Sequence, residues 1–168
     1  MVAATLTIET ATPGDFAAVD ALLARSYPIL LKPDYPPSVM VLAVPLIARA
    51  NPRLLSCGTY FVARSGGEIV GAGGWTPSAP GGASAQPLVA HVRHVVTDHR
   101  QTRRGIGRAL VGHLVGTAAA AGFSRLEAQA TRTAVPFYRA LGFNELGPVE
   151  VPLRPGIVFP AVSMARAL

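Results

Sequence analysis

The sequence predicts an α/β fold of the α+β type, in which a mixed, mostly antiparallel sheet of about seven strands is flanked by about four helices. Three observations support this prediction. Residues 6–10 alternate apolar and polar side chains, a Gly-Gly turn joins two strand-like segments as a hairpin, and a strand–helix–strand unit follows. Hairpins on both sides of one such unit favour a mixed sheet over a doubly wound parallel one. No repeat, linker or low-complexity segment divides residues 1–168, so we expect a single domain.

The N-terminal part of the chain is expected to begin as a strand and continue as helices. Residues 6–10 alternate apolar and polar side chains, and residues 12–15 then provide a turn and a helix N-cap. The helix that follows is predicted over about residues 16–26. After a proline-containing stretch, a second helical segment is predicted from about residue 38 to just before Asn51 and Pro52.

The middle of the chain has the clearest strand signals. Residues 59–64 and 69–75 form a predicted hairpin, joined by the turn Ser-Gly-Gly-Glu at residues 65–68. Residues 76–86 are rich in Pro, Gly, Ser and Ala, which predicts a loop. Residues 88–97 then predict a long strand.

A central helix is predicted over residues 105–121. Apolar residues recur along one face at helical spacing, and Gly122 then ends the helix: Ile106, Leu110, Leu114 and Ala118. The remaining predicted elements are a strand over residues 126–130, a short helix over 134–141, and a closing strand pair over 149–153 and 158–164.

The composition limits the class of protein. Half of the residues are apolar, but no apolar run approaches the roughly 20 residues needed to span a bilayer, so we expect no membrane insertion. The N-terminal residues lack the basic and apolar regions of a signal peptide, which predicts a cytoplasmic protein. The one cysteine, Cys57, cannot form an intrachain disulfide or a thiolate metal site, and we expect no metal.

The net charge of +6 and the pI near 10.4 favour an anionic ligand. Five arginines crowd one short segment, whereas the others are scattered: Arg93, Arg100, Arg103, Arg104 and Arg108. This clustering indicates a local anion site, not a long face that follows nucleic acid phosphates. Because the chain also has no aromatic-basic stacking motif and no recognition-helix pattern, we expect no nucleic acid partner.

The segment from Arg103 to Arg108 has the chemistry of a phosphate site. It leads from a predicted strand into a helix, where free N–H groups and the helix dipole attract anions and where Gly105 and Gly107 allow close approach of the backbone. A P-loop is not indicated, because no Gly-Lys-Ser/Thr follows the glycines. A dinucleotide fold lacks its third glycine and its parallel βαβ succession. A diphosphate-bearing ligand of another kind remains.

Two motifs resemble those of the GNAT N-acetyltransferase superfamily. The segment Thr-Arg-Arg-Gly-Ile-Gly at residues 102–107 matches the pyrophosphate motif Gln/Arg-x-x-Gly-x-Gly/Ala, except that Thr102 replaces Gln or Arg. Residues 135–143, Val-Pro-Phe-Tyr-Arg-Ala-Leu-Gly-Phe, resemble the family's FYxxLGF signature. The resemblance implies a GNAT-like fold and an acetyl-CoA-dependent N-acetyltransferase. Such an enzyme moves an acetyl group by direct attack to a primary amine of a small molecule or protein.

The resemblance also implies which residues bind the donor. The end of the fourth strand would separate from the fifth and pair its backbone with the pantetheine arm, while the helix N-terminus would meet the pyrophosphate. The donor-binding residues implied in this way are His94, Val95, Val96, Arg103, Arg104, Gly105, Ile106, Gly107 and Arg108. Tyr138 stands where the family places a tyrosine that protonates the departing CoA thiolate or steadies its sulfur. A phenol with a pKa of about 10 can donate to a thiolate whose pKa is about 8.5.

The sequence leaves several alternatives open. The general base that takes the amine proton is one of His91, His94, Glu127 and Glu150, or a water path. Thr131 stands where many family members have an asparagine that touches the cofactor, so it is a further candidate contact. A non-catalytic acyl-CoA-binding or regulatory module of the same fold is the alternative function. A homodimer is also open, because dimers are common in the family.

Overall fold

The computed structural model describes residues 4–81 and 85–168, and its central feature is a seven-stranded sheet in the order β1-β2-β3-β4-β5-β7-β6. The strands are β1 (Leu6–Thr10), β2 (Tyr60–Ser65), β3 (Glu68–Thr76), β4 (Val89–Thr97), β5 (Arg125–Ala130), β6 (Asn144–Arg154) and β7 (Ile157–Ala167). All neighbouring strands are antiparallel except β4 and β5, which are parallel. The predicted fold class is therefore confirmed, as is the hairpin of β2 and β3.

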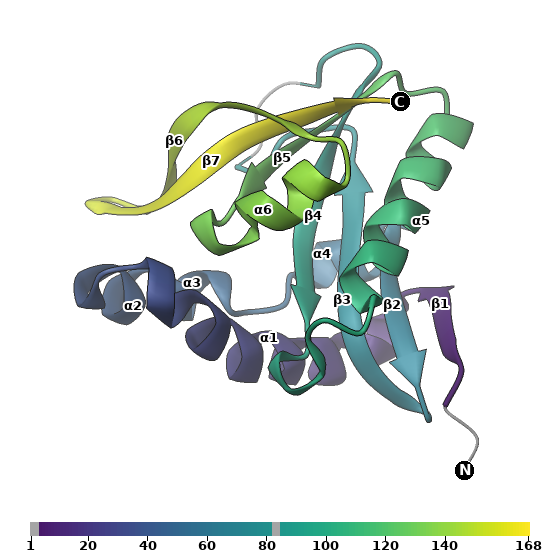
Figure 1. The fold of residues 1–168 in the computed structure, drawn as a ribbon, viewed down its shortest axis with the longest axis horizontal. Coiled ribbons are helices and arrows are strands. Elements are labelled where there is room, and N and C mark those ends of the chain that lie inside the picture. Colours follow the sequence, from purple (N-terminus) through teal and green to yellow (C-terminus); the bar gives the residue numbers. More distant parts are fainter. Residues whose placement is uncertain (1–3, 82–84) are drawn as a thin grey trace.

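Helices cover both faces of this sheet (Figure 1). They are α1 (Phe16–Leu31), α2 (Pro37–Leu42), α3 (Val44–Ile47), α4 (Pro52–Leu55), α5 (Ile106–Ala120) and α6 (Val135–Ala140). Alternation along β2 divides the apolar core between the faces, because successive strand side chains point to opposite sides. Tyr60 and Val62 pack with α1 to α4, whereas Phe61 and Ala63 pack with α5. No helix in the described ranges is long and apolar enough to cross a membrane.

The first helix is longer than predicted. We expected it to end near residue 26, ahead of Pro28, but α1 continues to Leu31 with Pro28 inside it. Tyr27 and Leu31 are buried in the core, and Pro28 lies on the exposed side. Burial of these two apolar side chains outweighs the loss of one helical hydrogen bond at the proline.

The second helical segment is divided where a single helix was expected. It forms α2 and α3 on either side of Ala43, because Pro45 lacks the N–H that a continuous helix would need. A further short helix, α4, starts where the segment was expected to end. The side chain of Asn51 accepts a hydrogen bond from the Arg53 N–H at 3.0 Å, and Pro52 occupies the first helical position, which makes this pair a helix start.

The closing hairpin of β6 and β7 extends well beyond the predicted strands. β6 contains Pro148 and Pro152, and it is the edge strand of the sheet, where a residue without an N–H is tolerated. The described residues of the predicted loop lie outside helices and strands, except that Thr76 ends β3. Residues 82–84 of that loop lie outside the described residues.

The sheet opens between its two parallel strands, which positions the site. Pairing of β4 with β5 is limited to three positions at their start, the last being His91 with Glu127. Beyond this pair the strands diverge, and Figure 1 shows β4 and β5 pointing apart, with α6 beside β5. The remainder of β4 therefore has β3 on one side and an unpaired edge on the other.

Candidate functional site

A β-bulge in β4 lies at the mouth of this opening. Ala72 pairs with Val96 and Gly74 with Arg93, so Gly73 alone faces two residues of β4. His94 adopts a φ of 46°, a left-handed conformation that is uncommon for a residue with a side chain. Only glycine fits opposite the bulge, because a β carbon at Gly73 would lie 2.8 Å from Cγ2 of Val95.

Two buried tyrosines hold the bulge in place. The hydroxyl of Tyr60 donates to the carbonyl of His94 at 3.0 Å, and the hydroxyl of Tyr27 donates to the carbonyl of Val95 at 3.1 Å. Burial raises the pKa of both phenols, so both remain donors at neutral pH. Just after β4, the N–H of Asp98 donates a hydrogen bond to the Val70 carbonyl of β3. Because the backbone groups of successive strand residues point to opposite edges, the N–H and C=O groups of Thr97 point to the unpaired edge of β4.

The segment between β4 and α5 is built to present N–H groups. Arg103 and Gly105 have φ values of 63° and 79°, and Arg104 between them has a negative φ, an alternation that points successive N–H groups into one concavity. Gly105 is the N-cap of α5, and no side chain caps this end. The first turn of α5 contains no acidic residue, so its free N–H groups and the helix dipole suit an anion.

A cavity of about 650 Å³ runs from this helix end along the unpaired edge of β4. It is lined by Val95, Val96 and Thr97 of β4, by the start of α5, and by α6. Gly107 brings α5 close to its neighbours, because a β carbon there would lie 3.2 Å from the Phe137 ring and 3.3 Å from Oγ1 of Thr97. The cavity is thus a groove with N–H donors at one end and apolar walls beyond.

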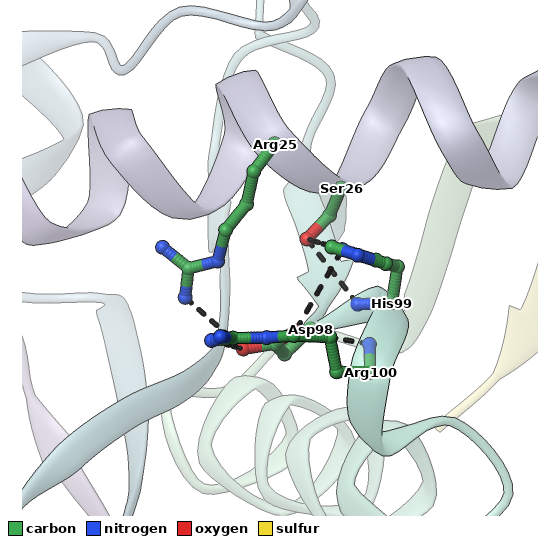
Figure 2. Close-up of polar contacts among 5 residues, drawn as sticks. All are labelled: Arg25, Ser26, Asp98, His99 and Arg100. Atoms are coloured by element: carbon green, nitrogen blue, oxygen red, sulfur yellow. Dashed lines mark hydrogen bonds and ion pairs between the residues drawn. The ribbon is translucent and has the colours of Figure 1, made fainter.

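An ion cluster around the buried carboxylate of Asp98 fixes the start of this segment to α1 (Figure 2). Asp98 is 1% exposed and accepts hydrogen bonds from the side chains of Arg25 at 3.1 Å and Arg100 at 2.8 Å, and from the Arg100 N–H. The hydrogen bonds from Arg100 and the charge of Arg25 hold the pKa of this carboxyl well below its usual range. Next to this cluster, the hydroxyl oxygen of Ser26 accepts a hydrogen bond from the His99 N–H at 3.3 Å. These contacts set the position of the loop that leads into α5.

Tyr138 of α6 lies where the groove meets a second cavity. Its ring is buried against Phe137 and Phe143, with centroid distances of 5.2 and 5.1 Å. No hydrogen bond joins its hydroxyl to another residue of the described ranges, and Tyr138 lines both cavities. Burial raises the pKa of this phenol, which keeps it protonated and able to donate.

The second cavity has a volume of about 360 Å³ and lies on the side of β6 and β7. The two cavities share five lining residues: Tyr27, Val95, Thr131, Ala134 and Tyr138. Because the same side chains border both spaces, a molecule in one can touch a molecule in the other at this junction. The arrangement suits a reaction between two bound substrates.

The structure brings most of the predicted donor-binding residues together. Those that line the larger cavity are Val95, Val96, Arg103, Gly105, Ile106, Gly107 and Arg108, and Thr102 and Thr131 line it as well. His94, the left-handed residue of the bulge, is in the lining of the smaller cavity and not in the described lining of the larger one. Arg104 is exposed and is absent from the described lining of either cavity, although its neighbour Arg103 contributes to the larger one.

The four candidate general bases are also separated by the structure. His94 alone among them lines the smaller cavity in the described part of the chain. Burial lowers its pKa to about 4, with the nearby Arg93 charge acting in the same direction, so its imidazole is neutral at physiological pH. His91 lies 3.9 Å from Glu127 in a pair between β4 and β5, and Glu150 is exposed on β6.

Sequence reasoning did not foresee where three residues of this site would lie. Tyr27 had been expected to follow the end of the first helix, so its place inside α1 was not foreseen. Arg93 had been grouped with the arginines of the predicted anion site, whereas it lines the smaller cavity. Phe137 belongs to the FYxxLGF motif but was given no role, and it lines the larger cavity. The available signal for Arg93 was a permanently charged side chain in a strand that has no other.

The parallel strands β4 and β5, which separate after their first three pairs, lie beside two adjoining cavities, and this arrangement is that of the N-acetyltransferase fold. A GCN5-related N-acetyltransferase from Rhodopseudomonas palustris shares this fold with a TM-score of 0.80 and 21% identity, over 100% of this chain and 99% of that one. The PaiA N-acetyltransferase of Thermoplasma acidophilum, in complex with coenzyme A, has a TM-score of 0.73 and 11% identity, over 98% of this chain and 99% of that one. A GNAT family acetyltransferase of Brucella melitensis, in complex with acetyl-CoA, has a TM-score of 0.60 and 18% identity, over 83% of each chain. Among curated proteins, none matches the sequence. The acetyltransferase (GNAT) family matches residues 21–143, and the chain belongs to this family.

Proposed function

We propose that the protein transfers an acetyl group from acetyl-CoA to a primary amine by direct attack, without a covalent acyl-enzyme. The observation that carries the proposal is the junction at Tyr138, where a groove that suits acyl-CoA meets a separate cavity that suits the acceptor. The reaction joins two substrates, and the shared wall of Tyr27, Val95 and Tyr138 lets them meet.

The residues of the groove fit each part of the donor. The uncapped N–H groups at the start of α5 and the guanidinium groups of Arg103 and Arg108 would bind the pyrophosphate. The backbone of Thr97 on the unpaired edge of β4 would pair with the amide groups of the pantetheine arm, as a neighbouring strand does. The thioester would then lie beside Tyr138.

The chemical step follows from this placement. The neutral amine nitrogen attacks the thioester carbonyl and its bond to carbon forms, while the carbon–sulfur bond breaks and CoA leaves as a thiolate. The nitrogen loses a proton as the amide forms, and this proton passes to the thiolate, so that the products are the amide and the CoA thiol. The hydroxyl of Tyr138 donates a hydrogen bond to the sulfur as negative charge develops there. The ammonium form of the acceptor first loses a proton, and we propose that water or His94 accepts it, because His94 is the one candidate base in the described lining of the acceptor cavity. The lowered pKa of His94, about 4, makes its imidazole a weak base.

Two measurements test this function. Binding is tested by thermal unfolding with CoA, acetyl-CoA and duplex DNA, since a ligand that binds the native state raises the melting temperature. We expect a rise with both CoA compounds and none with DNA. Failure of both CoA compounds, or a rise with DNA alone, contradicts the proposed donor site.

Turnover is tested by release of free CoA thiol with a panel of primary amines. Tyr138→Phe is expected to reduce turnover about 10²- to 10⁴-fold, with acetyl-CoA affinity in calorimetry unchanged. Unchanged turnover removes Tyr138 from the mechanism. Stabilisation by acetyl-CoA without CoA release from any amine would instead identify a non-catalytic acyl-CoA-binding module.

A further inference from the structure

The smaller cavity has an unusual balance of charge. Most of its described lining is apolar, and it includes Ile47, Val92, Val151, Leu153, Phe159 and Ala161. No Asp or Glu occurs in the described lining, and His94 is neutral at physiological pH. The one charged side chain that the described lining contains is therefore Arg93.

Arg93 has unused donors. Its Nη1 donates to Oγ1 of Thr76 at 3.0 Å, and the described residues give it no other hydrogen bond and no carboxylate partner. A guanidinium has five N–H donors, so most of its hydrogen-bonding capacity is free. Asp98 and Glu145, by contrast, each accept from arginines elsewhere in the fold.

The environment makes this free charge costly unless an anion binds. Arg93 is partly buried, and burial lowers the pKa of its guanidinium. A partly desolvated cation without a partner is unfavourable, and a carboxylate is the partner that a planar guanidinium binds best, through two parallel hydrogen bonds. Arg93 also immediately precedes His94 and Val95, so it lies close to the junction at Tyr138.

We infer that Arg93 binds a carboxylate of the acceptor, and that the acceptor class is a small primary amine carrying both a carboxylate and an apolar group, as an apolar amino acid does. This inference rests on the proposed acetyl transfer. The apolar walls would hold the apolar group, and the cavity volume of about 360 Å³ is of the order of small-molecule pockets. Polycationic amines are disfavoured, because Arg93 repels them and the described lining contains no carboxylate to attract them.

Matched acceptors test the inference. Phenylalanine and leucine are compared with their C-terminal amides, with 2-phenylethylamine, and with spermidine, each with acetyl-CoA and scored by CoA release. We expect kcat/KM for each acid to exceed that for its amide by about 10- to 100-fold, the range of a charge-assisted pair of hydrogen bonds. Spermidine is expected to be the poorest acceptor.

Variants assign the selectivity to Arg93. Arg93→Met is expected to bring the acid-to-amide ratio close to one, and Arg93→Lys to retain part of it, because an ammonium keeps the charge but not the fork. Arg53→Met is the matched control, since Arg53 is exposed on α4 and absent from the described cavity lining. The ratio in this control is expected to equal that of the wild type.

A binding readout that needs no turnover separates the two proposals. In the presence of CoA, N-acetylphenylalanine is expected to raise the melting temperature more than its amide does, and Arg93→Met is expected to abolish the difference. Equal rates for acids and amides, a preference for spermidine, or a ratio that survives Arg93→Met overturns the inference but leaves acetyl transfer standing. Absence of both CoA binding and CoA release overturns the proposed function itself, and absence of an acid-over-amide difference in binding overturns the role of Arg93.

Discussion

The half-buried histidine of the β4 bulge, His94, makes stability depend on pH in a specific window. His94 has a pKa of about 4 in the folded protein, against an ordinary value of 6.5, mainly because burial disfavours its charged form. The unfolded chain therefore binds more protons than the folded one between these two values. The stabilising effect of the neutral imidazole is fully present above pH 6.5 and is lost as the pH falls toward 4.

The size of the effect follows from the two pKa values. Between about pH 7.5 and about pH 4.5, protonation of His94 in the unfolded state lowers the free energy of unfolding by about 2–3 kcal/mol. For a chain of 168 residues this corresponds to a fall in melting temperature of about 5–10 °C. Asp98 adds no loss in this window, because its pKa is lowered from an ordinary value of 3.8 and its stabilising effect is lost only below that value.

Urea unfolding followed by circular dichroism at a series of pH values measures this dependence. The control is His94→Asn, because asparagine adopts the left-handed conformation readily and does not titrate. The variant retains His91, whose pKa is also lowered by burial, so the difference between the two proteins isolates His94. If the free energy of unfolding depends on pH equally in the wild type and the variant, His94 is not the source of the loss of stability between about pH 7.5 and about pH 4.5.

Three further predictions concern the donor groove. Gly107→Val places a side chain against the Phe137 ring, because a β carbon at residue 107 would lie 3.2 Å from that ring. The substitution is expected to cost about 1–3 kcal/mol of stability and to lower acetyl-CoA affinity at least about tenfold in calorimetry. Unchanged affinity would mean that the donor binds elsewhere. Asp98→Asn removes the carboxylate charge that Arg25 and Arg100 share. Because the side chains of these arginines are 34% and 57% exposed and remain solvated, urea unfolding is expected to show a loss of about 1–3 kcal/mol, and a loss below about 0.5 kcal/mol would exclude an anchoring role. Arg103→Glu is expected to weaken acetyl-CoA binding more than Arg104→Glu in the same titration, because only Arg103 is among the described lining residues; equal losses would mean that the net charge alone matters.

Local patterns account for the parts of the fold that the sequence predicted well. The alternation in β2 and β3, the two glycines of their turn, and the apolar stripe of α5 each depend on residues a few positions apart. The anion-binding chemistry of residues 103–108 is local in the same way. Such features are readable because the interactions that produce them lie within one element or one turn.

Contacts between distant residues account for what was missed. Tyr27 reaches Val95 across 68 positions, and Arg25 reaches Asp98 across 73, so neither partner could be chosen from spacing. The left-handed conformation of His94 depends on the bulge opposite Gly73, which is a property of strand pairing. Pro28 misled the prediction of α1, because the burial of Tyr27 and Leu31 was not visible in the sequence.

Arg103 and Arg104 are neighbours in the sequence, but the sequence does not show which of the two side chains lies in the cavity. Both belong to the motif, but backbone conformation directs neighbouring side chains apart, and the described cavity lining contains one of them. Membership in a motif predicts the backbone arrangement better than it predicts each side-chain contact.

A crystal structure of the protein with bound CoA tests the central claim most directly, because it locates the sulfur and the pyrophosphate together. The account predicts the sulfur within about 3–4 Å of the Tyr138 hydroxyl, with the pyrophosphate on the backbone N–H groups at the start of α5. A sulfur atom away from the junction of the two cavities, or a pyrophosphate bound elsewhere on the surface, would contradict it.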